Sequence, residues 1–406
     1  MNGFLLINKP VGPTSHDVIY KLRRILGIKQ IGHAGTLDPF ASGLLLVGVG
    51  EATKLLRHYV GLDKKYVATL RLGAVSDTYD RTGKVTSFKL QVSRLKKKDI
   101  EEVLKTFVGK QKQVPPMFSA KKVGGKKLYE LARQGQTIKR QAQNIEIFDI
   151  KLLSPKFQTT KIPNYQITIS CHVSSGTYIR TLAHDIGQAL GCGAYLEELK
   201  RTAIGDFKLE DAVGVIAREC TRDRGNPLVS ATNSGIAASP EYGLLAMTKG
   251  RRNDITKDNW QKFLIPLKTV LVSGTFDGVH QGHRNYFQQA RAYGQRLICI
   301  VGRDKIVEKI KGKPPRYSEK ERVHFVKSCP EIDRVYLGIN GPDHKIFDFT
   351  ASLKPDMIAL GYDQKAYTEN LEQEMKKRGL SVKTVRLKPF EAEKYKSSLI
   401  NKVELT

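Results

Sequence analysis

The 406-residue sequence lacks the patterns of a membrane protein or of a disulfide-rich secreted protein. No stretch approaches the roughly 20 consecutive apolar residues that a membrane-spanning helix needs. Its start, MNGFLLINKP, has no basic segment followed by a long apolar run, so we expect no secretory signal there. The five cysteines are odd in number, widely spaced and without a C-x-x-C pair, which favours free thiols. We therefore expect a soluble, cytoplasmic protein.

Acidic residues are scarce relative to basic ones. The chain has 40 Asp and Glu against 68 Lys and Arg, which gives a formal net charge of +28. Such a charge attracts polyanions and predicts binding that weakens as salt rises. A merely soluble basic surface is the plainer explanation, but lysines spread across the loops favour a nucleic-acid partner. The charge alone does not distinguish RNA from DNA.

The length exceeds what one hydrophobic core usually serves, so two or three domains are expected. In the first half, Thr14 and Ser15 can cap a helix whose apolar residues follow helical spacing up to Leu26, and Gly27 ends it. Alternating apolar residues predict a strand over 66–72. Further predicted elements are a helix near 100–107, a strand over 165–173 and a helix over 178–186. The pattern indicates an α+β domain with a mainly antiparallel sheet, and it leaves the strand order open.

One carboxylate, Asp38, lies in a glycine-rich segment just before an apolar strand, GHAGTLDPFASGLLLVGVG at residues 32–50. Turn formers surround it, so a simple turn is one interpretation. Four other candidates lie beside the ends of predicted elements. They are His33, Lys9 in INKPVGPTS, Tyr66 in KKYVATLRLG and Arg180 in SSGTYIRTLAHDIG.

Together these segments resemble the TruB family of tRNA pseudouridine synthases, from Phe4 to about Val213, because at least five of them match in the same order. The resemblance implies isomerisation of a uridine in the tRNA T loop (uridine 55), without a cofactor. It assigns Asp38 as nucleophile and Arg180 as the cation that keeps it charged. Tyr66 would lie against the flipped-out base and assist proton removal from carbon.

The same resemblance implies RNA contacts. His33 is expected to shape the RNA around the flipped nucleotide, and Tyr178 to touch it. Lys9 and Lys54 are candidates for phosphate contacts or loop supports. By residue type alone, Tyr66 would be a core residue, Arg180 a surface cation and His33 a loop residue. The basic segment 114–141 is either a solvated surface excursion or, as in the family, a flap that closes on RNA.

Residues 214–253 show neither helical nor strand periodicity, and the family-like pattern resumes over 254–267. This segment is interpreted as an irregular insertion, which is unusual within a compact domain. Disorder is one possibility. The alternative is a small lobe built on Leu244, Leu245 and Met247, whose apolar content is too low for a core.

A different pattern starts at Lys268, where many TruB-type enzymes carry an RNA-binding domain of the PUA type. The sequence KTVLVSGTFDGVHQGHRNYFQQARAYG predicts a strand, a glycine-rich turn and a helix whose beginning carries His280 and His283. Helix N-termini present free N–H groups to anions. Two imidazoles near one point can stabilise charge on an α-phosphate as pyrophosphate leaves. A metal pair or a plain loop are the alternatives, and with no third ligand adjacent no metal is predicted at these residues.

The string SGTFDGVHQGH is similar to the signature of the nucleotidyltransferase superfamily. Alternating strands and helices over 268–406, including a capping box at Ser318 and Glu321, predict a doubly wound parallel sheet with its ligand at the carboxyl ends of the strands. The chain looks most like archaeal-type FAD synthases, then glycerol-3-phosphate cytidylyltransferases. That implies Mg²⁺, ATP or CTP, and a phosphate acceptor such as FMN. Expected nucleotide contacts are Gly274, Thr275, Phe276, Asp363, Ser397 and Ser398.

The sequence therefore predicts a bifunctional enzyme, an N-terminal tRNA pseudouridine synthase joined to a C-terminal nucleotidyltransferase. The competing hypothesis is a non-catalytic tRNA-binding protein whose second half senses a nucleotide. Intact Asp38, Tyr66 and Arg180, with intact His280 and His283, argue against such a loss of activity. Oligomeric state and any coupling between the halves stay open.

Overall fold

The computed structural model describes residues 2–87, 95–119, 122–123, 126–127, 138, 140–158, 164–215, 254–365 and 368–391. The chain divides into two compact units, Met1–Ile265 and Pro266–Thr406, close to the change of pattern predicted at Lys268. None of the helices within the described residues is long and apolar enough to cross a membrane.

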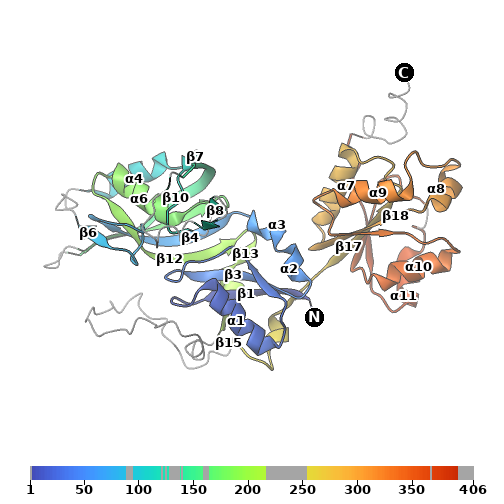
Figure 1. The fold of residues 1–406 in the computed structure, drawn as a ribbon, viewed down its shortest axis with the longest axis horizontal. Coiled ribbons are helices and arrows are strands. Elements are labelled where there is room, and N and C mark those ends of the chain that lie inside the picture. Colours follow the sequence, from blue (N-terminus) through green and yellow to red (C-terminus); the bar gives the residue numbers. More distant parts are fainter. Residues whose placement is uncertain are drawn as a thin grey trace, which may run out of the picture. The chain divides into compact units, whose positions relative to one another are not determined.

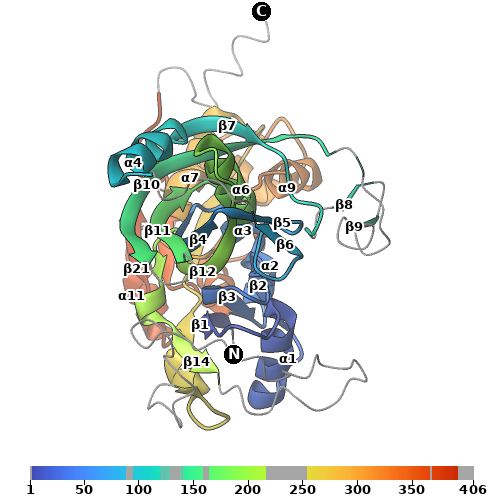
Figure 2. The ribbon, with the colours of Figure 1, turned by 90° about the vertical axis from the view of Figure 1, so that its left-hand side faces the viewer.

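The first unit is built on one large sheet, 12-stranded within the described residues. Its main path runs β15-β14-β1-β3-β12-β4-β11-β10-β7, and Figure 2 shows the strands from β10 to β1 in this order. Most neighbours are antiparallel, while β1–β14, β12–β3 and β14–β15 are parallel. The predicted α+β domain with a mainly antiparallel sheet is confirmed.

The strands of this unit are β1 Gly3–Lys9, β2 Ile31–Ala34, β3 Ser42–Val49, β4 Lys64–Leu72, β5 Ala74–Ser76, β6 Val85–Ser87, β7 Gly109–Gln113, β8 Lys122–Val123, β9 Lys126–Lys127, β10 Gln143–Gln158, β11 Asn164–Val173, β12 Ala194–Ile204, β13 Phe207–Lys208, β14 Val213–Val215, β15 Asp254–Ile255 and β16 Ile265–Pro266. The helices are α1 Ser15–Leu26, α2 Ala52–Leu55, α3 Arg57–Val60, α4 Lys97–Thr106 and α6 Ile179–Ala189, with short 3₁₀ turns at Leu209–Asp211 and Trp260–Phe263.

Helix α1 follows directly from its sequence. Thr14 is the N-cap, and it forms a capping box with Asp17, which satisfies the backbone N–H groups that a helix start leaves free. Gly27 ends the helix with φ of 68°, a left-handed conformation that glycine adopts without a Cβ penalty. The predicted start and end are confirmed.

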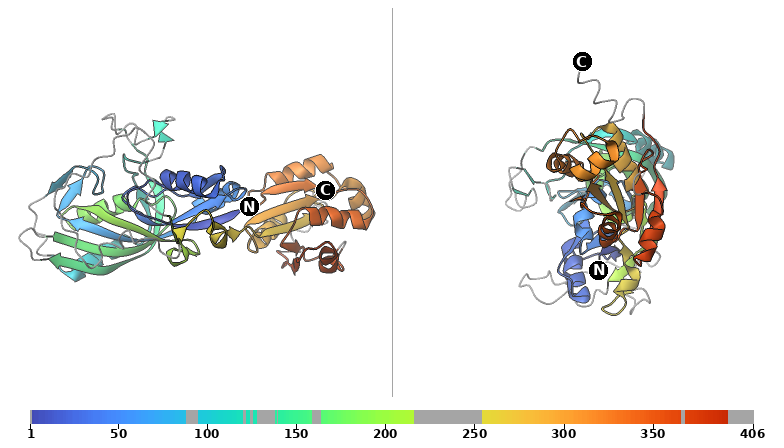
Figure 3. Two further views of the ribbon diagram at one scale, coloured as in Figure 1. Left: turned by 90° about the horizontal axis from the view of Figure 1, so that it is seen from below. Right: turned by 90° about the vertical axis from the view of Figure 1, so that its right-hand side faces the viewer.

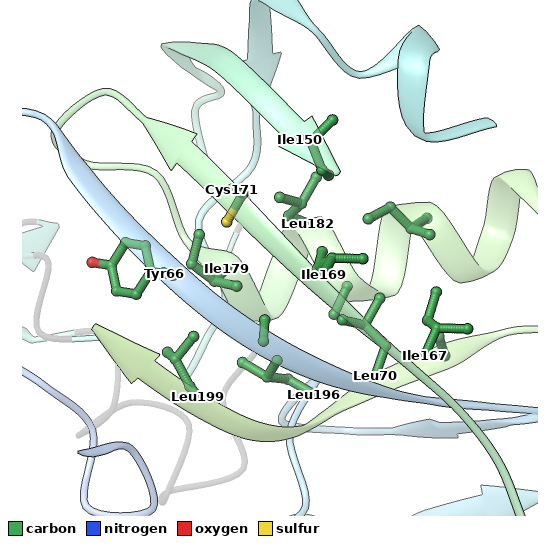
Figure 4. Close-up of a cluster of buried hydrophobic side chains, with 14 of the residues drawn as sticks. Tyr66, Leu70, Ile150, Ile167, Ile169, Cys171, Ile179, Leu182, Leu196 and Leu199 are labelled. Atoms are coloured by element: carbon green, nitrogen blue, oxygen red, sulfur yellow. The ribbon is translucent and has the colours of Figure 1, made fainter. Parts of the chain in front are cut away.

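The central strands and helix α6 enclose an aliphatic cluster that includes Leu70, Ile169, Leu182 and Leu196. Burying such side chains contributes roughly 1.5–3 kcal/mol each relative to leaving them exposed. Tyr66 lies at the edge of this cluster, and Figure 4 shows its hydroxyl oxygen pointing away from the aliphatic side chains. The core therefore holds the ring while leaving the hydroxyl for polar partners.

The second unit contains a five-stranded, all-parallel sheet in the order β19-β18-β17-β20-β21. Helices α7 and α9 lie on one side of it and α10 and α11 on the other (Figures 1 and 3). This confirms the predicted doubly wound parallel sheet, and the capping box at Ser318 and Glu321 is also present. The elements are β17 Thr269–Gly274, α7 Gln281–Arg291, β18 Arg296–Val301, α8 Asp304–Lys311, α9 Glu319–Lys327, β19 Arg334–Leu337, α10 Asp343–Ser352, β20 Met357–Leu360, α11 Leu371–Lys377 and β21 Lys383–Arg386.

Two local predictions need correction. Tyr178 is not in a helix, because α6 begins at Ile179 and Tyr178 is its extended N-cap. The range 214–253 begins with Gly214 and Val215, which are not irregular. They lie in β14 and pair with β15, so the chain on both sides of 216–253 meets in one sheet. Residues 216–253 and most of 114–141 lie outside the described residues.

Candidate functional sites

Asp38 lies in the loop between β2 and β3, where an arginine from a distant helix reaches it. The first turn of α6 carries Arg180, whose Nε lies 3.1 Å from Asp38 Oδ2. The Arg180 side chain is only 7% exposed, whereas that of Asp38 is 35% exposed. The carboxylate is therefore accessible from solvent, and the cation behind it is not.

A second acid, Asp80, holds the other side of the same arginine. Arg180 Nη1 lies 3.1 Å from Asp80 Oδ2. Asp80 is buried and also accepts hydrogen bonds from Thr78 Oγ1, at 2.9 Å, and from the backbone N–H of Thr82, at 2.8 Å. Sequence reasoning missed this residue. Its only signal was an acid within TYDRTG, a pattern typical of an exposed turn.

Burial raises the pKa of Asp38, the charge of Asp80 raises it further, and Arg180 opposes both effects. The net effect is a raised pKa, whereas the sequence-based expectation is that Arg180 keeps Asp38 charged and so lowers its pKa. The reason is that removing a carboxylate from water disfavours its ionised form more than Arg180 compensates. When ionised, the group is a stronger base and nucleophile than an ordinary aspartate.

Tyr66 faces this region from β4, where it pairs across the sheet with Arg201 of β12. Burial raises the pKa of Tyr66, and the charge of Arg201 opposes that rise. Arg201 is almost completely buried and also donates to Leu44 O, at 2.8 Å, and to Gly35 O, at 3.1 Å. Sequence reasoning missed Arg201, because a lone Arg in LKRTAIG resembles an ordinary surface cation.

Lys9 is fully buried and donates to backbone carbonyls of the Asp38 loop and its surroundings. Its Nζ lies 2.7 Å from Ala41 O, 2.8 Å from Pro10 O and 3.4 Å from Pro39 O. Burial lowers the pKa of Lys9 to about 8. Of the two predicted roles, this geometry favours the loop support, because no part of the side chain reaches the surface for a phosphate.

The three other predicted RNA contacts, His33, Lys54 and Tyr178, lie in different local environments. His33 in β2 makes an edge-to-face contact with His16 at 5.7 Å, and burial lowers its pKa to about 4. Lys54 on α2 is 63% exposed and pairs with Glu51 at 3.4 Å. At Tyr178, the backbone N–H and carbonyl are both bound by the side-chain amide of Gln113. Of these three residues, only Lys54 carries a cationic side chain that is largely exposed to solvent.

In the second unit, His280 and His283 lie together at the start of α7. Their ring centroids are 3.9 Å apart with an interplanar angle of 28°. Burial lowers the pKa of both, that of His283 to about 3. The rings of Phe276 and His283 are arranged edge to face, with their centroids 5.2 Å apart. Two neutral imidazoles therefore meet at a helix N-terminus, as predicted from the H-x-G-H spacing.

A cavity of about 420 Å³ opens beside these histidines. Four predicted nucleotide contacts, Gly274, Thr275, Phe276 and Asp363, line it. Ser397 and Ser398 lie outside the described residues. Another part of the wall is apolar and is formed by the β-sheet and helices α8 and α10, including Ile306, Ile310, Ile346, Phe347 and Leu360.

A buried arginine that sequence reasoning missed organises the rim of this cavity. Arg322 of α9 is fully buried and donates to Thr275 O, at 2.5 Å, to Gly302 O, at 2.8 Å, and to Asp304 Oδ1, at 2.6 Å. It thus connects the glycine-rich turn to the loop after β18. The motif SEKERVHF predicts the helix but not this inward orientation.

Comparison with known proteins separates the same two units. Residues 23–179 match the family model of the TruB family pseudouridylate synthase (N terminal domain), and residues 180–216 match the tRNA pseudouridylate synthase B C-terminal domain. Residues 271–403 match a cytidylyltransferase-like family model.

Individual relatives match the first unit. The chain is 49% identical over 216 residues to tRNA pseudouridine synthase B of Syntrophomonas wolfei, covering 53% of this chain and 71% of the relative. It is 47% identical over 211 residues to the protein of the same name from Bacillus velezensis, covering 52% and 68%. A solved Cbf5-Nop10-Gar1 complex contains a chain that is 31% identical, with 52% of each chain covered and a TM-score of 0.40.

Proposed function

Because this chain belongs to the TruB family of pseudouridylate synthases, we propose that its first unit isomerises uridine to pseudouridine in tRNA, at uridine 55 of the T loop. One observation carries the proposal: the partly exposed carboxylate of Asp38 lies 3.1 Å from a buried guanidinium, that of Arg180. The net charge of +28 supports a polyanionic substrate. The sharper assignment, to one uridine, rests on the family resemblance.

The isomerisation needs no outside reagent. The bond between ribose C1′ and N1 of uracil breaks, the base rotates, and a bond forms between C1′ and C5. The proton on C5 leaves and N1 gains one, so the atoms balance. The base must first leave its stack, since these atoms are inaccessible in a folded tRNA loop. Asp38, when ionised, acts as the nucleophile, and Tyr66 lies against the displaced base.

Arg180 and Asp80 keep this carboxylate in place. Arg180 fixes the orientation of Asp38 and stabilises its charge, and Asp80 in turn fixes Arg180 from the other side. Because Asp80 is held by Thr78 and Thr82, the guanidinium does not need to reorganise when substrate arrives.

The test is to incubate the protein with an unmodified tRNA transcript and to map pseudouridine chemically. Wild type should form it at the T-loop uridine, and Asp38→Asn should not. Asp149→Asn is the matched control, since Asp149 is a half-exposed acid of the same unit that pairs with Lys151. No product from wild type, or equal product from Asp38→Asn, would contradict the proposal.

For the second unit, the proposed activity is nucleotidyl transfer. A phosphate oxygen of the acceptor bonds to the α-phosphorus of a nucleoside triphosphate, the bond from that phosphorus to the β-phosphate bridge breaks, and pyrophosphate leaves. His280, His283 and the start of α7 stabilise the charge that develops on the α-phosphate. The low pKa values keep the two imidazoles neutral before the triphosphate binds, so they act first as hydrogen-bond donors.

The apolar wall of the cavity favours one acceptor over the other. A wall that includes Ile306, Ile346 and Phe347 matches a flat ring system better than a small polyol phosphate. We therefore place adenylylation of FMN by ATP ahead of cytidylyl transfer to glycerol 3-phosphate. A nucleotide sensor without catalysis would also use this cavity, but it would release no pyrophosphate.

Magnesium fits this cavity as a companion of the triphosphate. Among the described residues, no group of three or more His, Cys, Asp or Glu side chains is placed to bind a metal ion. Asp277 already accepts the backbone N–H groups of Arg316 and Tyr317, whereas Asp363 lines the cavity. Since Mg²⁺ is commonly bound by one or two carboxylates plus substrate phosphates, Asp363 is the residue that would hold it. When bound, the ion would neutralise phosphate charge.

The assay is pyrophosphate release with ATP plus FMN, compared with CTP plus glycerol 3-phosphate. The first pair should be the better substrate, and His283→Ala should abolish the activity. His324→Ala is the control, because His324 is a histidine of the same unit on α9 outside the cavity lining. Release with neither pair, or full activity in His283→Ala, would contradict the assignment.

A further inference from the structure

Arg201 occupies a position where four separate segments of the first unit meet. It lies on β12, and its cross-strand partners are Tyr66 on β4 and Gly43 on β3. Gly43 has φ of +107°, and a Cβ there would lie 2.3 Å from the Arg201 carbonyl oxygen. Only glycine permits so close an approach of the two backbones. This close packing against Gly43 therefore holds the backbone of Arg201 in place independently of its side-chain contacts.

The buried side chain of Arg201 then connects two other segments, because its Nε donates to Leu44 O on β3, at 2.8 Å, and its Nη2 donates to Gly35 O in the loop that carries Asp38, at 3.1 Å. Its charge also acts on Tyr66, its cross-strand partner on β4, where it opposes the rise that burial causes in the pKa of that phenol. The planar guanidinium offers five N–H donors in fixed directions, whereas a lysine offers one point of charge. Such a set of acceptors therefore fits arginine specifically.

From this geometry we infer that Arg201 is a positioning residue for the isomerisation, one that sets the orientation of the Tyr66 hydroxyl and ties it to the loop of the nucleophile. Because the guanidinium of its cross-strand partner Arg201 offers only N–H donors and no acceptor, the hydroxyl hydrogen of Tyr66 is expected to point away from it. The phenol therefore presents one fixed face to the displaced base. Burial raises the pKa of Tyr66, and the charge of Arg201 limits that rise.

This inference rests on the proposed pseudouridine synthase activity. The test is a double-mutant cycle of Arg201→Lys and Tyr66→Phe, read as the single-turnover rate of pseudouridine formation in the full chain. Arg201→Lys should slow the rate about tenfold in the wild-type background, with the KM for tRNA nearly unchanged. In the Tyr66→Phe background, where the hydroxyl is absent, the same change should cost at most about twofold.

A purely structural role for Arg201 would give the same fold-change in both backgrounds, and that result would overturn the inference. Lys64→Met is the matched control. Lys64 is a second buried cation, on β4, and it donates to the carbonyls of Val60 and Leu62. Its loss should lower the melting temperature without coupling to Tyr66→Phe.

Failure of the variant to fold and failure of the proposed activity can each be distinguished from failure of the inference about Arg201. If Arg201→Lys does not fold, Arg201→Gln, which retains an N–H donor without charge, takes its place in the same cycle. If wild type itself forms no pseudouridine, the proposed function fails. If wild type is active and the cycle is additive, only the role of Arg201 fails.

Discussion

The two sites differ in how far apart their parts lie along the chain. In the first unit, Asp38, Asp80 and Arg180 come from three separate segments and meet only when the sheet and α6 are assembled. In the second unit, the glycine-rich turn and both histidines lie within one strand–turn–helix segment. The first site therefore depends on long-range packing, and the second is largely formed by local structure.

Electrostatics separates the sites in a second way. Burial acts on a carboxylate in the first unit and raises the pKa of Asp38, whereas it acts on imidazoles in the second and lowers that of His283 to about 3. Both shifts favour the neutral form. The first unit offsets desolvation with Arg180, while the second leaves two neutral rings at the site where we propose that a nucleoside triphosphate binds.

The largest expected effect follows from removing the cation between the two acids. Arg180→Met leaves Asp38 and Asp80 facing each other without the arginine between them. Breaking such a buried pair typically costs about 3–5 kcal/mol of folding stability, and we expect pseudouridine formation to fall by on the order of 10²–10³. Thermal unfolding and single-turnover assays measure the two losses. Pyrophosphate release should persist, and its parallel loss would argue against two separate sites.

Asp80→Asn should have a smaller effect on the same site. The amide keeps the shape of the side chain but loses the charge that orients Arg180, so we expect a rate loss of roughly tenfold and little change in KM. The reference is Asp77→Asn in the same loop, since Asp77 accepts from the Lys84 backbone N–H and does not contact Arg180. Equal rate losses in both variants would mean that the rate depends on the structure of this loop and not on the charge of Asp80.

The stability of the second unit should depend on pH through the protonation of His283. Unfolded histidine binds a proton near pH 6.5, whereas folded His283 does so only near pH 3. Between these values the unfolded state holds more protons, so stability should fall as pH falls, by at most about 1.4 kcal/mol per pH unit. Thermal unfolding of wild type and His283→Asn, from pH 7 to pH 5, measures this slope. An identical slope in the variant would show that burial does not lower the pKa of His283.

In the first unit, the rate of pseudouridine formation should depend on pH through the ionisation of a carboxylate, that of Asp38. As the proposed nucleophile, Asp38 must be ionised to react, and its pKa lies above its ordinary value of 3.8. The rate of pseudouridine formation should therefore decline as pH falls through that raised pKa. A single-turnover profile whose acid limb has its midpoint at or below 3.8 would show that Arg180 outweighs burial.

The smallest expected effect concerns an exposed cation. Lys54→Ala removes a surface pair with Glu51, so stability should change by less than about 0.5 kcal/mol. If Lys54 contacts phosphate, KM for tRNA should rise about twofold and the salt dependence of binding should become shallower. Lys98→Ala, which breaks a similar exposed pair on α4, is the reference. Indistinguishable salt dependences would remove Lys54 from the RNA-binding surface.

The contrast between the units also explains what the sequence could predict. Local rules identified α1 through Thr14 and Gly27, and they placed His280 and His283 at the start of α7. Each of those features depends on residues only a few positions apart. The helix and the glycine-rich turn could therefore be predicted without knowledge of the sheet.

Asp80 and Arg201 could not be predicted in this way. Their roles depend on strand pairing between β4 and β12 and on the distant start of α6. Lys9 illustrates the same limit, because only its complete burial separates a loop support from a phosphate contact. A residue type becomes a functional assignment only when its partners across the sheet are known.

We propose that one chain carries two separate sites, with Asp38 essential to one and His283 to the other. The most direct measurement compares both activities, pseudouridine formation in a tRNA transcript and pyrophosphate release, in Asp38→Asn and His283→Ala. Each variant should lose one activity and keep the other near the wild-type level. Loss of both activities in either variant, or of neither, would contradict the claim.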